Sequence, residues 1–376
     1  MKRLNFLKQN KVALLFGCSA LFFACSSDDE DPILAPEIEL SVPDQAVSMT
    51  MTDSKVFEAS NLNDDMYTSE WMLGDSLVST TDTYEFIPES SGNYELSYRA
   101  SNISGEFSFN YNITVDAFIR PVSSESTAYV TELLEYLPAP GQFLNKNVGN
   151  FESAEGVLNG KSGLVTLGAW GGSITLAFDH TVVNSSDSSD FIIYGNGFSG
   201  AAEPGIIWVM QDENANGIAD DTWYEIKGSG HDLEGTKRNY SVTYFKPASD
   251  EDDVSWENND GETGVVKKNN FHSQAYYPEW ITEDSYTLTG TLLSDVNVDL
   301  SNPTFIKSNS FDYGYADNTA GGDNIDIADA MDADGEAVSL TGIDFIKIQT
   351  GVQADLGWLG ELSTEVKGVA DLSLLE

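Results

Sequence analysis

Short stretches in which polar and apolar residues alternate, separated by turn residues, run along most of the chain. Between positions 37 and 117, this period of two predicts strands that show one face to a core and the other to solvent. The predicted strands are Glu37–Val42, Ser54–Ala59, Thr68–Leu73, Thr83–Ile87, Asn93–Ala100 and Ser108–Val115. Six or seven short strands in about 80 residues, with one central tryptophan, Trp71, are typical of an immunoglobulin-like sandwich.

The chain from position 128 to 375 continues this pattern and is predicted to fold as one large jelly-roll-like β-sandwich, so the whole protein is predicted to be all-β. The predicted strands here are Leu164–Leu167, Ser173–Phe178, Phe191–Tyr194, Ile206–Gln211, Trp223–Lys227, Tyr240–Phe245, Phe305–Lys307 and Ile343–Gln349. Only Thr131–Tyr136 favours a helix, which Pro138 and Pro140 would end. The segment between Asp116 and Thr127 lacks periodicity, so we place the domain boundary there.

The first 24 residues have the features of a secretory signal peptide. Four basic residues precede an apolar stretch, Val12–Ala24, which is too short to be a stable membrane anchor. The stretch Leu21–Cys25 resembles the bacterial lipobox, in which the cysteine is acylated as the signal is removed, and this makes Cys25 the expected lipidation site. Leu15–Cys18 also resembles a lipobox, but cleavage there would leave only Val12–Gly17 as the apolar core.

Residues 25–36 are predicted to be an acidic tether between the lipid and the first domain. The run Ser26–Asp31 resembles the export signal that places some lipoproteins of gram-negative bacteria on the outer face of the outer membrane. The alternative is that this run is only a solvated spacer. On the first interpretation, lipid holds the protein to the outer membrane and exposes it at the cell surface without a transmembrane helix.

The charge of the chain excludes one class of partner. It has 61 acidic and 18 basic residues, a formal net charge of −43, which repels phosphate backbones and anionic lipid and attracts divalent cations. We therefore exclude nucleic-acid binding. A hydrophobic content of 41% is enough to build cores. The two cysteines, Cys18 and Cys25, lie in the signal and at the lipidation site, so disulfides and thiolate metal sites are excluded as well.

Four stretches of the second domain resemble a family of bacterial "cell surface protein" domains that occur with PKD-like modules. These stretches are Gly168–Asp179, Asp190–Asn196, Glu203–Ile206 and Trp358–Val366. In the first domain, Trp71-Met72-Leu73-Gly74-Asp75 is similar to the W-x-x-G-D turn of PKD-like domains. The resemblance implies a galactose-binding-like jelly roll on a surface lipoprotein that serves an outer-membrane nutrient receptor, of the TonB-dependent kind, including receptors for cobalamin.

The segment Asp212–Asp221 has the spacing of a calcium loop. Side-chain oxygens recur at every second residue, Gly217 permits a sharp turn, and Ca²⁺ takes 6 to 8 hard oxygen ligands. The expected ligands are Asp212, Asn214, Asn216, Asp220, Asp221 and the carbonyl of Ile218. The loop departs from an EF-hand because Trp223 occupies the twelfth position. We predict a structural Ca²⁺ between Trp208 and Trp223, on two strands expected to pair, and the alternative is a plain hairpin tip.

A second acidic cluster lies between Asp312 and Gly335. We interpret Asp332–Gly335 as a tight turn between Ile325–Met331 and Ala337–Leu340, and we do not expect a second ion in the cluster.

Candidate ligand contacts come from aromatic residues in irregular segments. Tyr276, Tyr277 and Trp280 lie beside Pro278, which interrupts any strand, so their rings could stack on a flat ligand or a sugar. The alternative is that they cap the core. Trp170 and Trp358, each among glycines, are weaker candidates of the same kind.

Catalytic motifs are absent. The three histidines have no metal-binding spacing, and no nucleophile elbow, phosphate loop or dinucleotide fingerprint occurs. We predict a non-catalytic surface lipoprotein that binds a nutrient, a small molecule of the cobalamin type or a glycan, for uptake. Two alternatives stay open: a jelly-roll glycoside-active enzyme, whose carboxylate pair only a structure could reveal, and a structural or adhesive surface protein.

Overall fold

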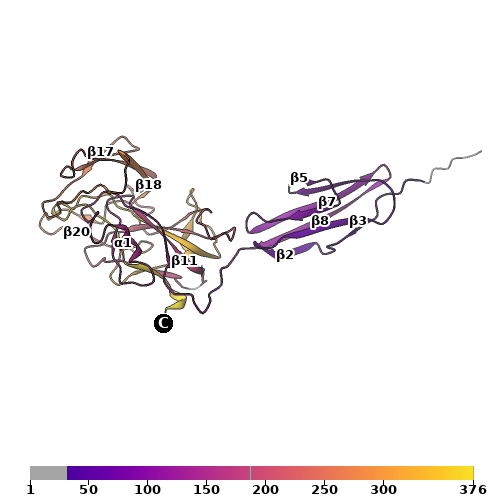
Figure 1. Ribbon diagram of the computed structural model, residues 1–376, viewed down its shortest axis with the longest axis horizontal. Helices are drawn as coiled ribbons and strands as arrows, with labels where there is room; N and C mark the ends of the chain where they lie inside the picture. The colour runs from indigo at the N-terminus through magenta and orange to yellow at the C-terminus, as the bar shows by residue number, and fades with distance from the viewer. Residues whose placement is uncertain (1–31, 187, 376) are drawn as a thin grey trace, which may run out of the picture.

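The computed structural model describes residues 32–186 and 188–375 and confirms that the protein is all-β. Strands β1 to β8 form one elongated body, and the strands from β9 onward form a larger one (Figure 1). Within the described residues, no helix has the length and apolar character needed to cross a membrane. The predicted signal peptide and Cys25 lie outside the described residues.

The first body is a sandwich of two sheets around an aromatic core. One sheet has the order β1-β3-β6 and the other β2-β8-β7-β4-β5. Its strands are β1 (Ile38–Leu40), β2 (Ala46–Thr50), β3 (Lys55–Asn61), β4 (Thr68–Leu73), β5 (Ser76–Ser79), β6 (Thr83–Phe86), β7 (Gly92–Asn102) and β8 (Gly105–Asp116). Trp71 is fully buried, 4.5 Å from Tyr98 between ring centroids. Gly74, with φ of 55°, and Asp75 form the turn between β4 and β5.

The second body is built on a six-stranded sheet of order β22-β14-β13-β23-β11-β9. Its strands are β9 (Glu132–Leu137), β11 (Ser173–Val183), β13 (Gly205–Met210), β14 (Tyr224–Ile226), β22 (Ala330–Met331) and β23 (Gly342–Thr350). A three-stranded sheet of order β21-β12-β25 shares the main hydrophobic core with it. These strands are β12 (Phe191–Tyr194), β21 (Asp323–Ile325) and β25 (Gly368–Asp371).

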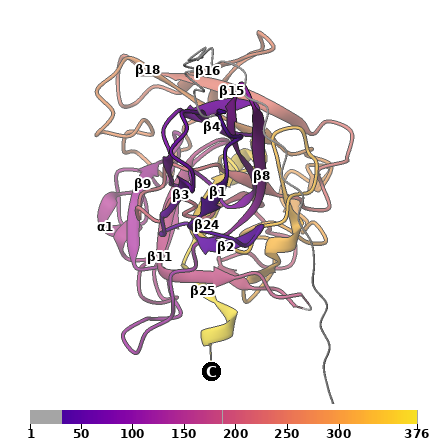
Figure 2. The same cartoon turned by 90° about the vertical axis from the view of Figure 1, so that its right-hand side faces the viewer.

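A further four-stranded sheet, β17-β16-β15-β18, packs around a second core (Figure 2). It consists of β15 (Lys237–Phe245), β16 (Val254–Asn258), β17 (Thr263–Val266) and β18 (Ser285–Leu292). The remaining elements are β10 (Val165–Thr166) paired with β24 (Glu365–Val366), β19 (Val298–Asp299) paired with β20 (Lys307–Ser308), α1 (Phe151–Glu155), η1 (Ile327–Asp329), η2 (Gly357–Leu359) and η3 (Leu372–Leu374). The second body is therefore a sandwich with an added four-stranded sheet.

Two predicted elements differ from the structure. Only Lys307 of the predicted strand Phe305–Lys307 belongs to a strand, β20. Thr131–Tyr136, which favoured a helix, is largely strand β9 and pairs with β11. Pairing buries Tyr136 to 3% exposure, and its hydroxyl donates to the Thr166 carbonyl at 2.7 Å. Burial and cross-strand contacts override the weak local preference for a helix.

The segment between the two bodies is held against the second one through Arg120. Its backbone N–H donates to Thr181 Oγ1 at 2.8 Å, and its guanidinium lies 2.9 Å from Asp212 Oδ2. Asp212 is fully buried at the end of β13, so this ion pair ties the connection to the predicted calcium loop.

Candidate ligand-binding site

The aromatic residues singled out in the sequence are mostly part of the core. Tyr276 and Tyr277 are 1% and 3% exposed, and the Tyr277 hydroxyl donates to the Glu283 carbonyl at 2.9 Å. Trp280 packs at 5.7 Å from Tyr136 between ring centroids. These rings close the core between α1 and the four-stranded sheet, and they offer no open face to a ligand in this structure.

Trp170 and Trp358 lie in different environments. Trp170 is fully buried, with its ring edge against Tyr240 at 4.7 Å. Trp358 is 54% exposed in η2, and it does not line the pocket between the two sheets described below. The structure therefore does not bring the five aromatic candidates together.

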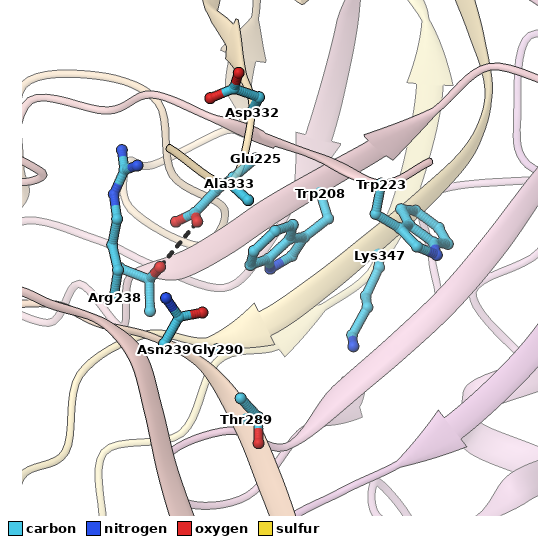
Figure 3. Close-up of a pocket in the computed structure, with 11 residues that line it drawn as sticks. Trp208, Trp223, Glu225, Arg238, Asn239, Thr289, Gly290, Asp332, Ala333 and Lys347 are labelled. Atoms are coloured by element: carbon cyan, nitrogen blue, oxygen red, sulfur yellow. Dashed lines mark hydrogen bonds between the residues drawn. The ribbon is translucent and has the colours of Figure 1, made fainter. Parts of the chain in front are cut away.

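A pocket of about 290 Å³ lies instead between the six-stranded and four-stranded sheets (Figure 3). The six-stranded sheet and its turns contribute Trp208, Trp223, Glu225, Asp332, Ala333 and Lys347. Strands β15 and β18 contribute Arg238, Asn239, Thr289, Gly290 and Thr291. Two indole rings and two cationic side chains thus meet in one cavity.

Strand register explains why the side chains of the first wall share one face. Trp208 on β13 is opposite Glu225 on β14 and opposite Lys347 on β23. Residues directly opposite in adjacent strands point to the same face, and Trp223 precedes Glu225 by two residues, which keeps that face. The neighbours Ile207 and Val209 point the other way, into the main core. Alternation in β13 therefore separates the pocket face from the core face.

A bulge shapes the second wall. The β15–β18 pairing shifts register between Lys237 and Tyr240, and Asn239 has a φ of 53°, in the left-handed region that asparagine tolerates better than most residues. An extra residue in one strand bends it and re-aims its side chains. Here Arg238 and Asn239, the two residues inside the shift, both line the pocket. The bulge is therefore a local feature that serves the cavity.

Hydrogen bonds fix Glu225 in place. One carboxylate oxygen accepts from Thr291 Oγ1 at 2.8 Å, and the other lies 2.8 Å from His231 Nε2. His231 Nδ1 accepts from the Gly228 N–H at 2.8 Å, so Nε2 carries the proton that it donates to Glu225. Glu225 is 4% exposed. It is a rigid acceptor in the wall of the pocket, and Figure 3 shows its carboxylate with a dashed hydrogen bond.

The two cations of the pocket have no carboxylate partner. Among the ion pairs of the described residues, none with a separation of 4.0 Å or less includes Lys347 or Arg238. Arg238 donates from Nη2 to the Met331 sulfur at 2.8 Å. Burial lowers the pKa of the Lys347 ammonium, and Glu135 offsets this only in part. The pocket lining thus carries two cations, Lys347 and Arg238, and two carboxylates, Glu225 and Asp332.

The predicted calcium loop connects the two strands that carry the tryptophans. The loop turns its oxygen-bearing side chains toward one another: Asp212 Oδ1 accepts from the Asn216 N–H, and Asn216 Nδ2 lies 3.1 Å from both oxygens of Asp220. Ala215 and Gly217 have φ of 59° and 75°, which closes the loop tightly. Burial raises the pKa of Asp221, and the charges of Asp212 and Asp220 add to the shift. A cation would relieve that repulsion, but the carboxylates of Asp212, Asp220 and Asp221 do not gather within 4.8 Å of one another, and Ca²⁺ at this loop stays a prediction.

We expect chelation to destabilise the second body through this loop. A ligand bound only by the folded state stabilises it by about 2.7 kcal/mol at a hundredfold excess over its dissociation constant. Asp220→Asn should remove part of that chelator sensitivity. It is preferable to Asp212→Ala, because Asp212 also holds Arg120. Differential scanning calorimetry in calcium and in chelator measures the effect, with the exposed Asp252→Asn as the control; equal melting of Asp220→Asn and the unmodified protein in both buffers would contradict the prediction.

The sequence contained one signal for this pocket. Trp208 and Trp223 were expected on paired strands, and β13 and β14 do pair, with Asp332–Gly335 forming the predicted turn nearby. Their common face toward a cavity depends on β15 and β18, which are distant in sequence. The pocket could therefore not be predicted from the loop alone.

No protein-family model and no curated protein sequence matches the chain. Among solved structures, it is similar to a SusE-like protein (8% identity, 90% of this chain and 98% of the other, TM-score 0.22). It is also similar to the SGBP-B protein of a Bacteroides ovatus mixed-linkage glucan utilization locus, solved with a heptasaccharide (13% identity, 67% and 70% covered, TM-score 0.21). A third is a quinonprotein alcohol dehydrogenase-like protein from Bacteroides thetaiotaomicron (12% identity, 62% and 72% covered, TM-score 0.22). The function is therefore argued from the pocket itself.

Proposed function

We propose that the protein is a non-catalytic binding protein for an acidic carbohydrate, which it holds in the pocket between the six-stranded and four-stranded sheets. The observation that carries the proposal is the meeting of two indole rings, Trp208 and Trp223, with two unpaired cations, Lys347 and Arg238. Indole faces pack on the apolar face of a sugar ring, and the planar guanidinium matches a carboxylate. Asn239 supplies a polar group for hydroxyls.

The size of the pocket favours a sugar over a larger ring system. Ligand pockets are typically about 300–1,000 Å³, and this one, at about 290 Å³, suits one terminal sugar. A corrin macrocycle would need the larger part of that range. Cobalamin, which the family resemblance implied, therefore remains a ligand to be tested rather than the one we favour.

The carboxylates of the pocket support binding over hydrolysis. Both oxygens of Glu225 are engaged, by His231 and Thr291, and Asp332 Oδ1 accepts the backbone N–H groups of Asp334 and Glu336. A glycosidase needs one carboxyl free to protonate the leaving group and another free to attack or to activate water. Both oxygens of Glu225 are therefore committed to structure, and the backbone holds one oxygen of Asp332.

The cellular role we propose follows the sequence. A lipid on Cys25 would hold the protein at the outer membrane, the acidic tether would expose it at the cell surface, and bound sugar would pass to a TonB-dependent receptor. The first body, whose core fills the space between its two sheets, would act as a spacer.

Calorimetry with a matched pair of ligands tests the proposal: oligosaccharides of uronic acid and the same chains after carboxyl reduction, with cobalamin as a third ligand. We expect Lys347→Met to weaken uronate binding about 10-fold or more, because a hydrogen bond to a charged group contributes about 1.5–3 kcal/mol. Binding of the reduced chains should barely change. Affinity for the uronate should also fall as pH rises through the lowered pKa of Lys347, since the ammonium is then lost.

Lys55→Met, on β3 of the first body, is the control and should bind like the unmodified protein. The mixtures are also analysed for products. Cleavage of the glycan would establish an enzyme, and binding of cobalamin without any glycan would replace the proposed ligand. Absence of binding to all three would favour a structural or adhesive protein.

A further inference from the structure

Three carboxylates converge in the interior of the second body, far apart in the sequence. Glu203, Asp317 and Glu365 each place an oxygen within 4.8 Å of the other two, and Asp317 and Glu365 are 0% and 5% exposed. Glu203 precedes β13, Glu365 begins β24, and Asp317 lies in the loop before β21. None of these three residues lines the pocket shown in Figure 3.

No basic side chain balances this charge. In the described part of the chain, none of the ion pairs includes Glu203, Asp317 or Glu365. Burial raises the pKa of all three carboxyls, and mutual repulsion raises the pKa of Glu203 and Asp317 further. Three acids this close in a low-dielectric interior need either protons or a cation.

A second observation concerns the cavity onto which two of these carboxylates open. It has a volume of about 470 Å³ and is lined by Glu203 and Glu365 and also by Glu361. Glu361 is 9% exposed; its Oε1 accepts the Gln142 N–H at 2.7 Å, but its buried Oε2 has no hydrogen-bond partner. An unpartnered buried carboxylate oxygen on the wall of the same cavity is costly unless a ligand satisfies it.

We propose that Glu203, Asp317 and Glu365 bind a hard divalent cation, of which Ca²⁺ is the probe, at the base of this cavity. All the ligand atoms are oxygens, which selects Ca²⁺, Mg²⁺ or Mn²⁺ over softer metals. Asp317 is pre-positioned: its Oδ1 accepts the N–H groups of Asn196 and Gly197 at 2.7 and 2.6 Å, and its Oδ2 accepts that of Glu365 at 2.9 Å. The ion would join the three segments that these hydrogen bonds already bring together.

This proposal departs from one expectation from the sequence. We did not expect an ion in the acidic cluster that contains Asp317, because its neighbours in sequence resemble turn residues. Glu203 and Glu365 complete the set from outside that cluster, and both belong to the stretches that carried the family resemblance.

Calcium stoichiometry separates this site from the loop at Asp212–Asp221. We would measure equilibrium binding of ⁴⁵Ca²⁺ to the purified protein, to Glu203→Gln/Glu365→Gln, to the loop variant Asp220→Asn, and to the triple variant. Asp317 is left intact because it holds three backbone N–H groups. We expect the double variant to bind one equivalent fewer than the unmodified protein, and the loop variant to keep the equivalent that the double variant loses.

Melting temperature supplies a second readout. Because glutamine is neutral and similar in shape to glutamate, the double variant should fold and should melt in chelator at or above the unmodified protein. The loop variant should keep a calcium-dependent rise, by about 5 °C or more, that the triple variant lacks. Equal calcium binding by the double variant and the unmodified protein would overturn the proposal. A loop variant whose melting temperature does not rise with calcium would also overturn the proposal. It would show that Glu203, Asp317 and Glu365 only share protons.

Discussion

Replacing Trp208 by alanine is expected to reduce affinity for the acidic glycan about 30-fold or more. Loss of an aromatic side chain from a well-packed, desolvated contact costs about 2 kcal/mol or more, which corresponds to that factor. Trp208 lies in the centre of the sheet wall, between Glu225 and Lys347 in register, so it is the ring that a bound sugar would cover most fully. Titration calorimetry with the uronate oligosaccharide measures the change.

Trp358→Ala is the matched control, because it removes an exposed indole that does not line the pocket. Circular dichroism and melting temperature check that the Trp208 variant keeps its fold. If Trp208→Ala binds the glycan as tightly as the unmodified protein while Trp358→Ala does not, the site lies near η2 and not between the two sheets.

The pocket and the predicted calcium loop belong to one hairpin, and this connects stability to binding. The loop joins β13 to β14, and these strands position Trp208, Trp223 and Glu225. Loosening the loop would change the spacing of the two indoles before it unfolded the sheet. A calcium ion in the loop would therefore act on affinity although it touches no ligand.

Local patterns were sufficient for the strands that stand between an apolar core and solvent. Thr68–Leu73 and Phe191–Tyr194 have the bounds that alternation predicted, because each has one clearly buried face. Strands β2, β5, β16, β17, β18, β19 and β25 were missed. Strands β5 and β17 have four residues each with two adjacent apolar ones, Leu77-Val78 and Val265-Val266, so neither shows alternation.

Neither candidate site could be predicted from local patterns, because each is formed by residues that are distant in the sequence. Trp208 meets Arg238 only because β15 folds over the six-stranded sheet, and the bulge at Asn239 has no signature beyond a residue that tolerates positive φ. Glu203 and Glu365 are separated by most of the second body. They come close because β24 pairs with β10 and because Glu203 lies just before β13. Both features depend on the tertiary structure.

The buried histidine His180 is the centre of a charged network that the sequence also did not reveal. On β11, it is fully buried, with Nδ1 2.6 Å from Asp179 Oδ1 and Nε2 2.9 Å from Asp371 Oδ2. Asp371 ends β25, so the network joins the six-stranded sheet to the three-stranded sheet. Burial lowers the pKa of His180, but the hydrogen bonds that its ring donates to Asp371 and Asp179 outweigh burial and raise the pKa overall. Burial alone would raise the pKa of Asp371, but the hydrogen bond from His180 outweighs burial and lowers the pKa of Asp371 overall.

His180→Gln is expected to lower the free energy of unfolding by about 3–5 kcal/mol near pH 5.5, because it leaves the carboxylate of Asp371 buried without its cationic partner. The raised pKa of His180 means that its contribution is complete below its unfolded value, about 6.5, and is lost as pH rises through the folded value. The lowered pKa of Asp371 means that its contribution is lost as pH falls below about 4. The penalty should therefore be greatest between these limits and smaller at pH 9.

Urea unfolding across this pH range measures the effect, and His272→Gln is the control, since burial lowers the pKa of His272 and it belongs to no ion pair of the described residues. The double variant His180→Gln/Asp371→Asn should recover part of the loss, because it removes the unpaired charge. A penalty for His180→Gln that is the same at pH 5.5 and pH 9 would show that the imidazole contributes by packing alone, and that the two sheets are not joined by charge.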